Sequence, residues 1–165
     1  MANGRSVGRK GTGRDPGGFM ALPWSVLDCP SYAALSHPAR SMLLELGRQY
    51  VRDNNGRLLA SGAYMASRGW KSNDVITRAL RELLAAGFVH QTVRGQRPNK
   101  ASWYAITWFS LDRHEGYDLG AVESFRRGSY RDKAPIKNAT LTPSRGVGGA
   151  SIAPSHGVGR RSSTP

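Results

Sequence analysis

One amphipathic segment, residues 73–85, constrains the fold of this chain more than any other stretch. Its apolar residues recur with the spacing of one stripe on an α-helix: Val75, Ile76, Ala79, Leu80, Leu83 and Leu84. Ser72 or Asn73 is the expected N-cap, because either side chain can accept a hydrogen bond from a free N–H of the first turn. Gly87 is expected to end the helix in the left-handed conformation.

The opposite face of this predicted helix is polar and cationic. It carries Asn73, Thr77, Arg78 and Arg81, with the acids Asp74 and Glu82 among them. Groups that can hydrogen-bond base edges therefore lie beside cations that can reach phosphates. An ordinary solvated helix face would show the same pattern, so the neighbouring segments must decide between the two interpretations.

The segments on either side predict a helix-turn-helix followed by a hairpin. Residues 63–68 are expected to form a short helix, and Gly69 supplies the sharp turn into the next one. Residues 88–94 and 103–108 are rich in β-branched and aromatic residues, which predicts two strands. The loop between these strands carries Arg94, Arg97 and Lys100 and no acid. Such a cationic tip can contact phosphates or enter a minor groove.

A second amphipathic helix is expected upstream, capped by Ser36. Its apolar stripe comprises Ala39, Met42, Leu43, Leu46, Tyr50 and Val51. Residues 57–60 are expected to add a short strand beside the hairpin. Before the helix, residues 19–27 are expected to run extended along the core, and Asp28 is expected to cap a short turn at 30–35.

Charge favours a polyanionic partner. The formal net charge is +13 and the pI is about 10.9. The basic excess is spread along the chain: +3 over residues 1–18, +5 over 19–112 and +5 over 113–165. Nucleic acid is the simplest partner, although net charge alone does not separate DNA, RNA and an acidic membrane surface.

Several classes of function are disfavoured by what the sequence lacks. The single cysteine, Cys29, excludes an internal disulfide and a cysteine-rich zinc site, and we expect it to be half-buried. The four histidines stand in unrelated segments, and no nucleophile motif or phosphate loop is present. We therefore expect no enzyme activity, no cofactor and no metal. No apolar run has the length of a membrane span, so we expect a cytoplasmic protein without membrane contact.

The sequence resembles winged helix-turn-helix proteins of bacteria and their mobile elements. The resemblance lies in the pattern Ala-Leu-x-x-Leu-x-x-x-Gly-Phe-Val at residues 79–89, and more widely in residues 19–112. The longer arrangement is also similar to the DNA-binding part of phage and plasmid replication proteins. The fold class implied is α+β: a helical core with a small antiparallel β-hairpin wing.

The expected function is sequence-directed binding of double-stranded DNA. In this hypothesis Lys71 and Ser72 anchor the start of the recognition helix on phosphate. Base edges face Asn73, Thr77 and Arg78. The DNA backbone or minor groove is held by Arg81, Arg94, Arg97 and Lys100.

Different biological roles share this chemistry. A replication protein would bind repeated origin sites and recruit a replication partner, whereas a transcriptional regulator would bind operator half-sites, usually as a homodimer. A winged-helix protein-interaction module with incidental charge is an alternative of another class. RNA binding is also open, although the strands lack the aromatic pattern of RNA-recognition domains.

The remaining segments are assigned by composition. Residues 1–18 are expected to form a disordered basic arm, and residues 133–165 a disordered tail rich in Pro, Gly, Ser and Arg. The tail holds a weak eleven-residue repeat without an apolar stripe. Residues 113–132 are expected to be a docking extension in which Phe125 and Tyr130 pack back on the domain. The run 111–118 combines a histidine with acids at no standard metal spacing, so a solvated loop is expected there.

Overall fold

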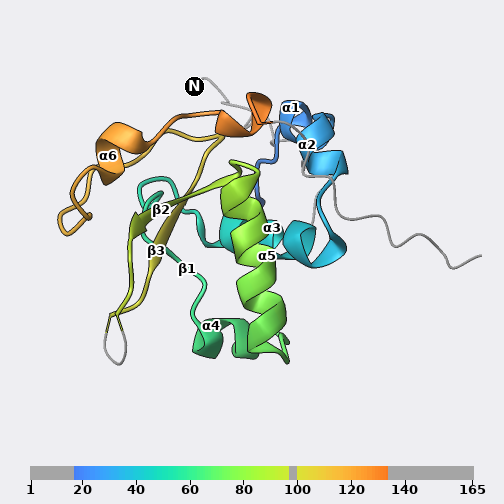
Figure 1. Cartoon of the computed structure of the whole chain (residues 1–165), viewed down its shortest axis with the longest axis horizontal. Coiled ribbons are helices and arrows are strands. Elements are labelled where there is room, and N and C mark those ends of the chain that lie inside the picture. Colours follow the sequence, from blue (N-terminus) through green and yellow to red (C-terminus); the bar gives the residue numbers. More distant parts are fainter. Residues whose placement is uncertain (1–16, 97–99, 134–165) are drawn as a thin grey trace, which may run out of the picture.

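The structure is a computed structural model that describes residues 17–96 and 100–133 (Figure 1). The expectations for the basic arm up to residue 16, for the tail from residue 134 and for Arg97 therefore lie outside the described residues. Within those residues the chain is a mixed α+β structure with six α-helices and a three-stranded antiparallel sheet. The elements are α1 (Trp24–Leu27), α2 (Pro30–Ala33), α3 (His37–Gln49), β1 (Leu58–Leu59), α4 (Gly62–Ser67), α5 (Asn73–Ala85), β2 (Val89–Val93), β3 (Trp103–Ile106) and α6 (Ala121–Ser124), with a 3-10 turn at Ser129–Arg131.

The order of elements from α3 to β3 agrees with the sequence-based expectation. Helix, strand, two helices and two strands follow one another, and β3 lies between β1 and β2 in the sheet. This arrangement is compatible with a winged helix-turn-helix. The β2–β3 hairpin is antiparallel, with Val89 opposite Ile106 and an irregularity between Gln91 and Val93.

Both outer edges of the sheet carry additional hydrogen bonds. At β1, the Gln49 side chain accepts from Leu59 N at 2.8 Å and donates to Leu59 O at 2.9 Å. At β2, Asp118 N donates to Thr92 O at 3.0 Å. Leu59 of β1 and Thr92 of β2 therefore have backbone partners outside the ladder.

The helix α3 begins where the sequence predicts and ends earlier. The Ser36 hydroxyl accepts from Ala39 N at 3.3 Å, which confirms the predicted cap. The helix ends at Gln49, so the last two residues of the predicted stripe lie beyond it. Tyr50 is half-buried against the ring of Phe109, whereas Val51 is 70% exposed and does not join the core.

The pair of helices α4 and α5 is bounded by a cap and by two left-handed glycines. Ser72 is the N-cap of α5 and accepts from Val75 N at 3.4 Å. Gly69 between α4 and α5 has φ +88°, and Gly87 after α5 has φ +77°. Only glycine adopts such angles without steric cost. The predicted turn at Gly69 and the predicted helix end at Gly87 are therefore confirmed.

The hydrophobic core is formed between α3, α5 and the inner face of the sheet. Both helices contribute the stripes predicted from sequence, and α4 adds one buried side chain. Its largest fully buried members are Met42, Leu43, Leu46, Leu58, Met65, Leu83, Phe88, Val93 and Ile106, joined by Val26 from α1 and Tyr130 from the C-terminal extension.

The N-terminal lead-in differs from the expectation in two respects. Residues 24–27 form the short helix α1 rather than an extended segment. The N-cap of α2 is Cys29 rather than Asp28, because the Cys29 sulfur accepts from Tyr32 N at 3.4 Å. The expectation of a half-buried Cys29 is confirmed.

The C-terminal extension returns to the core beyond the end of α5. The Tyr130 ring stacks on Phe88 with a centroid separation of 5.0 Å. The Ser129 hydroxyl donates to Gly87 O at 2.7 Å, and Gly128 N donates to Thr107 O at 2.7 Å. The end of the extension therefore packs against Phe88 and the glycine that ends α5. Among the described residues, no helix has the length and apolar character needed to cross a membrane.

Candidate nucleic-acid interface

The outer face of α5 and the turn before it are exposed. The candidate DNA-contacting residues of this region all lie in solvent: Lys71, Ser72, Asn73, Thr77, Arg78 and Arg81. The aromatic residues of the extension do not cover it, since Tyr130 packs on Phe88 and Phe125 packs edge-on against His90 of β2. The buried side of the same helix is fixed by Ile76, Ala79 and Leu83. The amphipathic pattern therefore presents the polar face outward.

One ion pair lies on this face. Arg78 Nη2 is 2.9 Å from Asp74 Oδ2, and the two side chains are 66% and 73% exposed. An exposed pair one helical turn apart stabilises the protein by only about 0.3–0.5 kcal/mol. A phosphate or a base edge can therefore replace Asp74 as the partner of Arg78 at little cost.

Thr77 and Asn73 are less free than the sequence suggests. The Thr77 hydroxyl donates to Asn73 O at 2.8 Å, so its proton is engaged by the helix backbone. Thr77 can still accept a hydrogen bond or place its methyl group against a thymine methyl. The Asn73 side-chain oxygen lies close to Gly62 at the beginning of α4, which limits the space around this amide.

Glu82 is not part of the exposed face, contrary to the sequence-based expectation. It is half-buried, and its carboxylate accepts from Ser36 N at 2.7 Å and from the Ser36 hydroxyl at 2.6 Å. The carboxylate thus joins α5 to the N-terminus of α3. Its charge is withdrawn from the outer face, which leaves that face more cationic than the sequence indicates.

The turn between α4 and α5 forms a shallow hollow of about 310 Å³ next to Lys71 and Ser72. Arg68, which the sequence analysis did not select, lies on its rim. The Arg68 Nε atom is 2.8 Å from Glu45 Oε2, and this hydrogen bond raises the pKa of the guanidinium. Arg68 therefore has a carboxylate partner, and Lys71 is the cation left available at this turn.

The β2–β3 hairpin presents Arg94 and Lys100 to solvent. Its loop is closed by two backbone hydrogen bonds, from Gln96 N to Lys100 O at 2.9 Å and from Lys100 N to Gln96 O at 2.8 Å. Gly95 N also donates to the Ser102 hydroxyl at 2.9 Å. The base of the predicted wing is therefore ordered on both strands, and Arg97 lies in the segment that the structure does not describe.

An acid reaches this hairpin from outside its own loop. Asp118 accepts from Arg94 N at 2.6 Å, and its other oxygen is 3.5 Å from Lys100 Nζ. The hydrogen bond from Arg94 N, with the nearby cations, lowers the pKa of Asp118. The hairpin sequence contains no acid, but in the folded chain Asp118 neutralises part of the positive charge of the hairpin. Asp118 belongs to another loop, and its contact with the hairpin could not be predicted from the sequence.

A further cation near the hairpin is Arg57, the residue directly before β1. The Arg57 guanidinium lies 5.0 Å from the centroid of the Trp103 ring, a cation–π contact. Pairing of Leu59 with Trp103 brings the start of β1 next to β3. Arg57 could not be selected from sequence, because its place beside Trp103 depends on the register of a two-residue strand.

The cationic residues form two groups, one along α5 and one on the hairpin. In Figure 1 the described parts of the β2–β3 hairpin run toward the lower end of the molecule, where α4 lies and α5 begins. The end of the C-terminal extension, after α6, lies at the opposite end, near the last turn of α5. The hairpin and the beginning of α5 therefore lie toward the same end of the protein.

Within residues 17–96 and 100–133, no group of three or more His, Cys, Asp or Glu side chains is placed so that it could hold a metal ion. His90 is half-buried, and its Nε2 lies 2.9 Å from Ala121 O, as expected for a structural histidine.

Comparison of the chain with protein-family models, with curated proteins and with solved structures found no match.

Proposed function

We propose that this protein binds double-stranded DNA in a sequence-directed manner through α5 and the β2–β3 hairpin, as a winged helix-turn-helix does. The observation that carries the proposal is the exposed outer face of α5, on which Lys71, Arg78 and Arg81 stand while the acid Glu82 is turned inward. The β2–β3 hairpin adds the exposed cations Arg94 and Lys100.

The dimensions suit a duplex. A helix of 13 residues is about 20 Å long and about 10 Å across, which fits a major groove about 12 Å wide. In that position Arg78 and Asn73 supply the donors and acceptors that distinguish base pairs. Lys71 and Arg81 would contact phosphates, and the hairpin cations would hold the backbone beside the groove.

Fluorescence anisotropy with labelled duplexes over a range of salt concentrations tests the proposal. Removing a cation that contacts phosphate should weaken binding to all sequences and make the slope of log K against log salt shallower by about 1. We expect this result for Arg81→Ala. Arg48→Ala removes an exposed cation of α3 outside the proposed surface and serves as the matched control. Equal effects of the two substitutions would reject the assignment.

A different substitution tests whether Arg78 recognises DNA bases. Arg78→Lys keeps the charge but loses the two-pronged donor geometry that recognises guanine. We expect it to reduce the preference for the best site by about 1–3 kcal/mol while changing nonspecific affinity little. A variant that retains full preference would show that Arg78 does not contact bases.

The biological role can be resolved by footprinting on the DNA that surrounds the gene. Paired half-sites protected by a dimer are expected for a regulator, and an array of repeated sites for a replication protein. A protein-interaction module, the alternative from another class, would bind no duplex above the level of a charge-matched control.

A further inference from the structure

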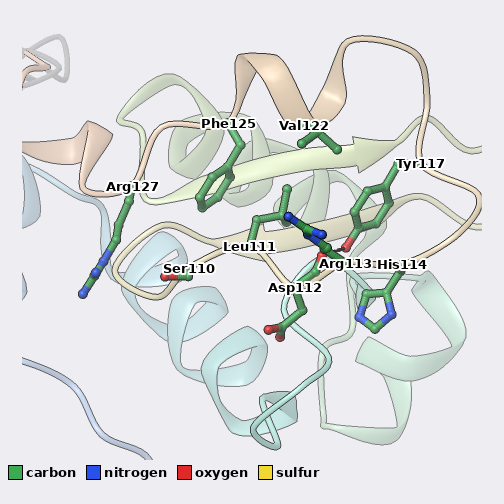
Figure 2. A pocket seen from close by; sticks show the side chains of 9 residues that line it. All are labelled: Ser110, Leu111, Asp112, Arg113, His114, Tyr117, Val122, Phe125 and Arg127. Carbon is green, nitrogen blue, oxygen red and sulfur yellow. Dashed lines mark hydrogen bonds between the residues drawn. The ribbon is translucent and has the colours of Figure 1, made fainter.

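A groove lies away from α5, between the loop that follows β3 and the extension. It encloses about 660 Å³, a volume in the range of ligand sites. One wall belongs to residues 110–117 and the other to residues 122–127, and we call it the 110–127 groove. Figure 2 shows its lining, of which the residues used below are Leu111, Arg113, His114, Val122, Phe125 and Arg127.

The groove has an apolar centre. Figure 2 shows the side chains of Phe125 and Val122 on the extension across from Leu111 on the facing loop. Val122 is 56% exposed, so part of this apolar surface is open to water. Phe125 is held in place by His90, with their rings edge-on at 5.4 Å. An apolar side chain of a partner would bury this surface without rearranging the wall.

The charges around this centre are mainly positive. Arg113 and Arg127 are exposed, and neither takes part in an ion pair within the described residues. The one lining acid, Asp112, already accepts from Asn55 N at 2.8 Å. Nε2 of His114 is buried and has no hydrogen-bond partner among the residues described. The groove is therefore complementary to carboxylates placed on either side of an apolar group.

We propose that the 110–127 groove docks an acidic peptide segment of a partner protein, with a leucine or phenylalanine of that segment against Phe125, Val122 and Leu111 and its flanking carboxylates on Arg113 and Arg127. The chain's own C-terminal sequence does not fit, since residues 134–165 contain four cations and no acid. A second copy would bring the same net charge of +13 toward the two arginines. The DNA backbone gains nothing from an apolar wall.

The proposal does not depend on DNA binding, because no lining residue belongs to α5 or to the hairpin. DNA and partner could therefore be held at the same time, which would make the protein an adaptor between a DNA site and an acidic protein. Failure of either proposal can be recognised separately, since different residues carry them.

Peptide binding to the full-length chain tests the inference. The probe is a fluorescein-labelled peptide, Glu-Asp-Leu-Phe-Asp-Glu, and the comparison peptides replace Leu-Phe by Ser-Ser or all acids by Lys. We expect the first peptide alone to bind. Arg127→Glu and Arg113→Glu should each weaken it by about tenfold. Arg126→Glu changes an exposed neighbour outside the groove by the same charge and should cost far less.

Four results would overturn the proposal. These are equal losses in Arg127→Glu and Arg126→Glu, equal binding of the Ser-Ser peptide, displacement of the peptide by duplex DNA, and absence of binding at peptide concentrations of about 1 mM. Amide shift mapping supplies an independent readout. Shifts are expected at Leu111, Val122 and Phe125, and shifts confined to α5 would contradict the assignment.

Discussion

Glu82 of α5 accepts two hydrogen bonds from Ser36, one from the backbone N at 2.7 Å and one from the hydroxyl at 2.6 Å. Ser36 is also the N-cap of α3, since its hydroxyl accepts from Ala39 N. The two residues are 46 positions apart in the sequence, and together they fix the helix that presents the candidate DNA surface against the helix that forms the core.

Breaking this link should destabilise the fold without touching the exposed face. We expect Glu82→Ala to lower the free energy of unfolding by about 1–3 kcal/mol, because it leaves Ser36 N without its partner in a half-buried place. In a double-mutant cycle with Ser36→Ala, measured by urea denaturation, the two losses should not add. Glu115→Ala, at an exposed acid, is the control. Simple additivity of the two changes would show that the carboxylate is not coupled to the cap.

Asn55 is expected to be the most sensitive polar residue of the core. It is fully buried, its amide donates to Ile106 O at 3.0 Å and Ser110 O at 2.7 Å, and its oxygen accepts from Ile106 N at 2.8 Å. Asn55→Ala should lower the free energy of unfolding by on the order of 3 kcal/mol, because buried backbone groups lose their partners. Asn55→Asp should also be harmful, since a carboxylate cannot donate to the two carbonyls. Urea melts check both, with exposed Gln96→Ala as the control, and losses no larger than that of the control would contradict this role.

Tyr117 should make stability depend on alkaline pH. Burial, followed by the charge of Asp112, raises the pKa of Tyr117 from 10.0 to about 12. The folded protein therefore holds the phenol proton at pH values where the unfolded chain has lost it. This contribution to stability is complete below pH 10 and is lost as the pH rises toward about 12. Thermal melts across that window should fall less steeply for Tyr117→Phe than for the wild type. Burial also raises the pKa of Tyr104, so some slope should remain in the variant. Parallel curves would argue against the shift.

Asp118 is expected to limit DNA affinity. It lies 3.5 Å from Lys100 and competes with phosphate for that cation. Asp118→Asn retains an acceptor for Arg94 N and removes the charge, so affinity for duplex DNA should rise about three- to tenfold at low salt. Anisotropy titrations measure the gain. Glu123→Gln removes an exposed acid of α6 and should change affinity less. An unchanged affinity in Asp118→Asn would mean that the hairpin does not contact DNA.

Local patterns predicted most of the element order, because each relied on neighbours in the chain. Ser36 and Ser72 cap the expected helices, and Gly69 and Gly87 take left-handed angles where the stripes end. Errors arose where one residue decided the outcome. Cys29 rather than Asp28 caps α2, and Val51 lies outside α3 because the helix ends at Gln49, two residues sooner.

Contacts between distant segments could not be predicted in the same way. Glu82 turns inward because Ser36 lies opposite it, and Asp118 approaches the hairpin because the extension folds along β2. The spacing of polar residues shows which of them share a helix face. It does not show which distant residue each side chain will contact. The 110–127 groove is likewise created by two segments that meet only in the folded chain, so the run 111–118 predicted no more than a solvated loop.

The hydrogen bonds at the two margins of the sheet have a consequence for self-association. Gln49 occupies both backbone groups of Leu59, while Asp118 occupies Thr92 O and Arg94 N. Exposed strand margins are where copies of a protein stack into fibrils. Here a side chain and a returning segment take those positions, so these backbone groups are not free to pair with a strand of another copy.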